Sequence, residues 1–145
     1  MADTKEKLDI SVQLNDMVAV IAIQRPPYNF FDYDLIQQIA DTLEALDENP
    51  DCRAVVLAAQ GKAFCAGANF GDGSGVKRDG DVAGQQSRGS AGHLYQEAVR
   101  LFRTAKPIIA AVHGAAVGGG LGLSMVADFR VACPESRFCA NFTRL

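Results

Sequence analysis

Hydrophobic and polar positions alternate in two short segments near the start of the chain, residues 9–14 and 18–24. A period of two is typical of a strand with one buried face. Between the segments lie Asn15 and Asp16, residue types that favour turns. The pattern therefore predicts a β-hairpin.

A helical pattern follows Arg25-Pro26-Pro27, which cannot continue a strand ladder. Apolar residues recur there at intervals of three and four, at Leu35, Ile36, Ile39, Leu43 and Leu46. Asp32 precedes them and is a suitable N-cap. The helix should end before Asn49-Pro50, because proline disfavours a helical residue ahead of it.

The remaining apolar segments repeat one sequence of elements. They predict a buried strand over 54–59, a helix over 94–104, a strand over 108–112, a glycine turn at 118–120, a helix over 121–127 and a strand over 129–132. Recurrence of strand, strand and helix indicates a wound α/β structure whose turns stack on one another.

Residues 71–92 are rich in Gly, Asp, Ser and Gln and contain little that could anchor them in a core. A linker between domains is one interpretation. The strand pattern resumes after a single further helix, however, so we favour a mobile loop over an active site.

The apolar stretch 107–127 is long enough to span a membrane. Its glycines and His113 favour a buried strand, turn and helix instead.

The chain ends with bulky apolar side chains at Phe138, Phe142 and Leu145. Natural termini are usually polar, and this ending predicts a chain truncated at its C-terminus.

Composition narrows the class of protein. The 145 residues form one ordinary domain, and a net charge of −3 argues against a nucleic-acid partner. The polar N-terminus resembles no targeting segment. The cysteines at 52, 65, 133 and 139 lack the close spacing of a disulfide framework. We therefore expect reduced thiols and a cytoplasmic protein.

Two glycine-bearing turns are the main candidates for chemistry. Residues 61–70 directly follow a predicted buried strand, and Gly67 would allow adjacent amides to point outward. Residues 114–122 lead from a strand into a helix, whose first amides lack partners within the helix. Together the two turns could hold one anionic oxygen.

Other glycine motifs fail against the same residues. The third glycine of a dinucleotide fingerprint would fall at Met125, and Gly61-Lys62 is followed by Ala63 rather than the Ser or Thr of a phosphate loop. Val126 occupies a glycine position of a serine elbow. The histidines and cysteines lack metal-ligand spacing, so no metal is expected.

The turns resemble signatures of the enoyl-CoA hydratase/isomerase (crotonase) family. GKAFCAGANF is similar to its first motif, KPIIAAVHGAAVGGGLGLSMVADFRVA to its second, and RPPYNFFDYDL to its opening segment. The resemblance covers residues 10–145. It implies a single α/β domain over 1–145, a crotonase-like superhelix of ββα turns without the family's C-terminal helical trimerisation region. It also implies an acyl-CoA substrate and, for the full-length protein, a homo-trimer or hexamer.

The resemblance assigns three backbone roles. The amides of Ala68 and Gly119 match the donors that bind the thioester oxygen, and the carbonyl of Ala66 matches an acceptor for the CoA adenine. No cofactor beyond the CoA moiety is implied. A thioester that becomes enolate-like would be stabilised by such donors.

The chain departs from the family where its glutamates are expected, at Gly122 and Phe142, and Asn69 replaces an aspartate of the first motif. Glycine and phenylalanine cannot move protons, so hydration by the two-glutamate route is disfavoured. One alternative is an acyl-CoA-binding protein without hydratase activity. Another is the dehalogenase/isomerase-like branch, whose carboxylate would lie beyond Leu145.

Four side chains could supply a different base: Asp72, His93, Tyr95 and Glu97. For each of them a solvated position in a loop or helix is the more ordinary interpretation. His113 is more typical of a packed or hydrogen-bonded residue than of a base. Cys65 is expected to be a small buried residue, since no histidine partner can be assigned to it.

Overall fold

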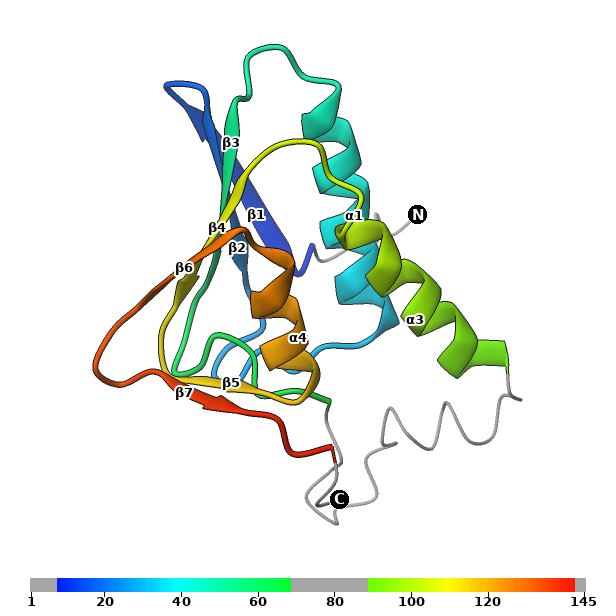
Figure 1. The fold of residues 1–145 in the computed structure, drawn as a ribbon, viewed down its shortest axis with the longest axis vertical. Helices are drawn as coiled ribbons and strands as arrows, with labels where there is room; N and C mark the ends of the chain where they lie inside the picture. Colours follow the sequence, from blue (N-terminus) through cyan, green and yellow to red (C-terminus); the bar gives the residue numbers. More distant parts are fainter. Residues whose placement is uncertain (1–7, 69–88, 143–145) are drawn as a thin grey trace, which may run out of the picture.

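The computed structural model describes residues 8–68 and 89–142, with only the backbone described for 89–93 and 95. Five strands form one sheet in the order β1-β2-β3-β4-β6, and a second, two-stranded sheet pairs β5 with β7. The strands are β1 (Ile10–Asn15), β2 (Val18–Ile23), β3 (Ala54–Ala59), β4 (Ile108–Val112), β5 (Ala115–Val117), β6 (Phe129–Ala132) and β7 (Arg137–Cys139). The helices are α1 (Tyr33–Asp47), α3 (Gly89–Leu101) and α4 (Gly119–Val126), all on the same side of the large sheet (Figure 1).

The predicted hairpin is confirmed, but its turn lies one residue further along. β1 and β2 are antiparallel, with Asn15 paired to Val18. Asp16 and Met17 form the turn, with φ angles of 47° and 66°. Two central residues with positive φ match the right-handed twist of the strands, so the two-residue turn determines the register.

The predicted first helix and its cap are confirmed. Asp32 has an extended backbone, and its side chain accepts a hydrogen bond from the Leu35 amide at 3.0 Å. The apolar positions of α1 are buried, as their spacing predicts. The helix ends at Asp47, ahead of Asn49-Pro50.

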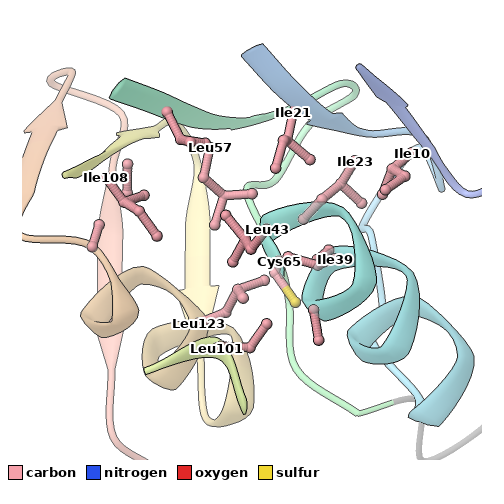
Figure 2. Packing of buried hydrophobic residues seen from close by; sticks show 14 of the residues in the cluster. Ile10, Ile21, Ile23, Ile39, Leu43, Leu57, Cys65, Leu101, Ile108 and Leu123 are labelled. Carbon is pink, nitrogen blue, oxygen red and sulfur yellow. The ribbon is translucent and has the colours of Figure 1, made fainter. Parts of the chain in front are cut away.

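β2, β3, β4 and β6 are parallel, and the predicted ranges of β3, β4 and β6 are confirmed. Alternate residues of β2, β3 and β4 are buried. Figure 2 shows Ile21, Leu57 and Ile108 from these strands pointing toward Leu43 of α1 and Leu123 of α4. The core therefore lies between the large sheet and its helices.

The helix predicted over 94–104 begins earlier, at Gly89, and ends earlier, at Leu101. Residues 89–92 of the predicted 71–92 loop are therefore helical, while 69–88 lie outside the described residues. The early end is set by a residue of another helix, α1. The Asp47 carboxylate accepts hydrogen bonds from the Thr104 hydroxyl at 2.9 Å and the Ala105 amide at 3.0 Å, and these bonds hold the chain outside the helix.

The last third contains two strands that the sequence did not predict. β5 and β7 pair in parallel, with Ala115 opposite Arg137. Each is three residues long, too short for a periodic pattern to be visible. α4 starts at Gly119 rather than 121.

Within the described part of the chain, no helix has the length and apolar character needed to cross a membrane.

Candidate active site

The two glycine turns lie side by side. The Cys65 amide donates to the Ala115 carbonyl at 3.0 Å, and the Val117 amide donates to the Cys65 carbonyl at 3.1 Å. Cys65 and Ala116 form an isolated parallel bridge. These bonds align the first turn with β5, which leads directly into the second turn.

Gly67 adopts a backbone conformation that few other residues tolerate. Its φ angle is 90°, and a Cβ placed on it would lie 2.8 Å from the Val117 carbonyl oxygen. Both the conformation and the lack of space therefore require glycine here. The need for a freely rotating φ at Gly67 is confirmed, and the outward direction of the adjacent amides stays a prediction.

Asn29 anchors the first glycine turn through side-chain hydrogen bonds. Its side chain is fully buried, and its amide donates to the carbonyls of Gln60 and, at 2.7 Å, Ala63. Its Oδ1 accepts from the Arg25 amide at 2.9 Å. No role for Asn29 was predicted from the sequence. Its φ of 51° belongs to the left-handed region that asparagine tolerates. An asparagine in a proline-rich turn was therefore the sequence feature from which this conformation could have been predicted.

The second turn ends in the first residue of α4. The Gly118 amide donates to the Cys139 carbonyl at 2.9 Å, and its own carbonyl accepts from Gly122 at 3.0 Å. Gly119 is the first residue of the helix, so its amide has no carbonyl partner one turn earlier. The positive end of the helix dipole lies at the same place.

A pocket of about 710 Å³ opens at these turns. Its lining includes all three residues assigned by the sequence, Ala66, Ala68 and Gly119, and also Gly122 and Phe142. The structure thus brings the expected donors to one pocket, together with both positions at which glutamates were expected.

The walls of this pocket are mainly apolar. They include Phe30, Phe31, Ile36, Leu94, Ala98, Leu101, Phe102, Val117, Leu123 and Val126. Among the described lining residues, Asn141 has the only polar side chain. Its Oδ1 is buried and has no hydrogen-bond partner among the residues that the structure describes. Asn141 was not predicted from the sequence, because a single asparagine before Phe142 belongs to no recognisable motif.

Of the four candidate bases, only Glu97 has a side chain that the structure describes, and it does not line the pocket. Glu97 hydrogen-bonds to Arg100 and to the Tyr33 hydroxyl at 3.4 Å, and it is not among the lining residues. His93 and Tyr95 belong to α3, but their side chains are outside what is described, as is Asp72. The identity of a base therefore stays a prediction.

His113 and Cys65 have structural surroundings. His113 Nε2 lies 2.9 Å from the Gly61 carbonyl oxygen, which confirms the expected hydrogen-bonded role. Cys65 is fully buried, and burial raises the pKa of its thiol to about 11. A thiol of this kind is protonated at neutral pH and is a poor nucleophile. The expectation that Cys65 is a packed residue is confirmed.

The comparisons agree with this architecture. The solved structure of an enoyl-CoA hydratase from Shewanella pealeana superimposes with a TM-score of 0.81 and 30% sequence identity, over 96% of this chain and 52% of that one. The fold is therefore the crotonase-like α/β spiral. The model of the enoyl-CoA hydratase/isomerase family matches residues 13–145, and the chain belongs to that family.

Two sequence relatives illustrate the range of the family. A protein of Mycobacterium tuberculosis named "Probable enoyl-CoA hydratase EchA14" is 36% identical over 138 residues, which cover 94% of this chain and 51% of the relative. A peroxisomal Delta(3,5)-Delta(2,4)-dienoyl-CoA isomerase of Arabidopsis thaliana is 30% identical over 125 residues, covering 81% and 45%. The chain thus spans about half the length of the relatives it matches.

Proposed function

We propose that the protein acts on an acyl-CoA thioester and polarises its carbonyl with the amides of Ala68 and Gly119. The observation that carries this proposal is the position of both residues in one apolar pocket, one of them at the N-terminus of a helix. Charge that develops on the thioester oxygen would be stabilised by two fixed donors, each worth roughly 3 kcal/mol in the transition state.

The same pocket accommodates the rest of the ligand in this proposal. Its phenylalanine walls suit an acyl chain, which is driven from water by the hydrophobic effect. The carbonyl of Ala66 would accept a hydrogen bond from the CoA adenine. Ala66 is already fixed through its own amide, which donates to the Tyr28 carbonyl at 2.9 Å.

The reaction that follows polarisation is a second, separate part of the proposal. Gly122 and Phe142 line the pocket and provide no acid or base, so we expect chemistry other than two-glutamate hydration. Isomerisation or dehalogenation-like chemistry with another base is the first candidate. Binding of acyl-CoA without turnover is the alternative, supported by the same two residues.

Two measurements on the purified full-length protein test these parts. Calorimetry with crotonyl-CoA and a 3-enoyl-CoA should detect binding, and a folded protein that binds neither would refute the thioester site. Turnover of either compound identifies an enzyme. Binding without turnover of a panel of acyl-CoA thioesters favours the binding protein. Gly119→Ala, whose Cβ would overlap the Phe31 ring and displace this amide, should lose binding or turnover under conditions in which circular dichroism shows the variant to be folded.

A further inference from the structure

Phe31 touches both glycine turns. Its amide donates to the Gly67 carbonyl at 3.1 Å, and it forms an isolated parallel bridge with Ala68. Its backbone is thereby tied to the turn that carries one of the proposed donors. A phenylalanine side chain is neither an acid, a base nor a metal ligand. Any effect of Phe31 on the reaction must therefore come from how it positions the two amides.

The ring of Phe31 packs against the other turn. A Cβ placed on Gly119 would overlap Cε1 and Cζ of this ring and would lie 3.1 Å from Cδ1. All three of the nearest atoms belong to Phe31. The ring therefore occupies the space that a side chain at position 119 would need, and it lies directly on the first residue of α4.

Phe31 is itself held firmly. It packs against the hydrophobic core and immediately precedes Asp32, the N-cap of α1. Arg25 pairs with Asp32 at 2.7 Å and donates to the Phe30 carbonyl at 3.3 Å. The segment that carries Phe31 is therefore fixed on one side by Asp32, through the α1 cap and the ion pair, and on the other by the hydrogen bond from Arg25 to the Phe30 carbonyl.

We infer that Phe31 is a positioning residue that sets the spacing between the amides of Ala68 and Gly119. Its backbone fixes the first amide and its ring fixes the second. Donors act on an oxyanion only within about 2.7–3.1 Å, and a misplacement of about 1 Å can cost on the order of 100-fold in rate. This inference rests on the proposed function for its catalytic consequence, but the contact between the two residues can be tested separately.

A double-mutant cycle tests the contact. Phe31→Leu removes the two overlapping ring atoms, Cε1 and Cζ, and so makes room for a Cβ at position 119. Gly119→Ala should lower the urea midpoint strongly in the wild type and much less in the Phe31→Leu background. Phe30→Leu is the matched control, because its ring lines the same pocket and is not among the atoms nearest to that Cβ. An equal loss in the Phe31→Leu, Phe30→Leu and wild-type backgrounds would overturn the contact.

A spectroscopic measurement tests the positioning role. A conjugated thioester such as cinnamoyl-CoA absorbs at longer wavelength when its carbonyl is polarised. We expect Phe31→Leu to reduce this red shift while the Kd changes little, and Phe30→Leu to change the Kd with the red shift retained. Phe31→Tyr, which keeps the ring, should restore the shift.

The outcomes separate this inference from the proposed function. If wild-type protein binds cinnamoyl-CoA without any red shift, the proposed role of the Ala68 and Gly119 amides is refuted, whatever the double-mutant cycle shows. If the wild type gives a red shift that Phe31→Leu leaves intact, only the role of Phe31 is overturned.

Discussion

The carbonyl of Cys65 accepts the Val117 amide at 3.1 Å and lies directly beneath Gly120 of α4. One backbone carbonyl thus joins the first glycine turn to the helix that begins at the second. The arrangement leaves no room for a side chain at position 120. It explains why the two turns, although distant in sequence, stay in contact.

Substitutions at Gly120 and Gly122 should therefore have opposite effects on stability. A Cβ on Gly120 would overlap the Cys65 carbonyl oxygen, whereas a Cβ on Gly122 would meet nothing within 4 Å. Gly120→Ala should lower the free energy of unfolding by about 1–3 kcal/mol or more. Gly122→Ala should raise it by about 0.5–1 kcal/mol, because alanine is the better helix former. Urea denaturation measures both, and similar effects at the two positions would contradict the packing.

Asn29 is expected to be a major contributor to stability. Its side chain is buried and makes three hydrogen bonds to backbone groups of Arg25, Gln60 and Ala63. Asn29→Ala would leave these backbone groups without their partner, at about 1–3 kcal/mol for each group that water cannot reach. Denaturant unfolding should show a loss of this size. A change within about 0.5 kcal/mol, the range of an ordinary surface substitution, would be incompatible with the observed contacts.

Cys65 gives the protein a predictable response to alkaline pH. Burial raises the pKa of its thiol from an ordinary 9.0 to about 11 in the folded state. Between these values the unfolded chain binds fewer protons than the folded one, so the free energy of unfolding falls as pH rises, by up to about 1.4 kcal/mol per unit. The contribution is fully present below pH 9.0 and is lost as pH approaches 11.

Cys65→Ala is the control for this titration. The substitution removes the thiol, so the stability of the variant should fall less steeply over the same pH range. Urea unfolding of both proteins at several alkaline pH values provides the comparison. Identical slopes would show that the thiol is not the titrating group.

Gly122→Glu should add a carboxylate to the pocket. The position lines the pocket, and a Cβ there is unobstructed. We expect the variant to hydrate crotonyl-CoA faster than the wild type, on the order of 100-fold for a well-placed general base. Gly122→Gln has the same shape without the charge and should not gain activity. Equal rates in the two variants would mean that the carboxylate does not reach the reacting water.

The sequence predicted the elements whose cause is local. β3 and β4 are continuous apolar runs, and Asp32 caps α1 through its own side chain, so pattern and residue type were sufficient. Gly67 was selected because glycine tolerates positive φ angles, and the structure gives it a φ of 90°. Ala68 and Gly119 were found through motifs, and the structure places both at one pocket.

The elements that were missed depend on distant partners. β5 and β7 are strands only because they pair with each other, and the end of α3 is set by the carboxylate of Asp47 on another helix. Asn141 lines the pocket because the tertiary structure brings it there, and it belongs to no sequence motif that could have identified it. None of these relationships is visible in the periodicity of a single segment.

A crystal structure of the full-length protein with a bound acyl-CoA thioester tests the central claim most directly. Our account predicts that the thioester oxygen lies within about 2.7–3.1 Å of the amide nitrogens of both Ala68 and Gly119. A thioester oxygen that meets neither amide, or only one of them, would contradict it.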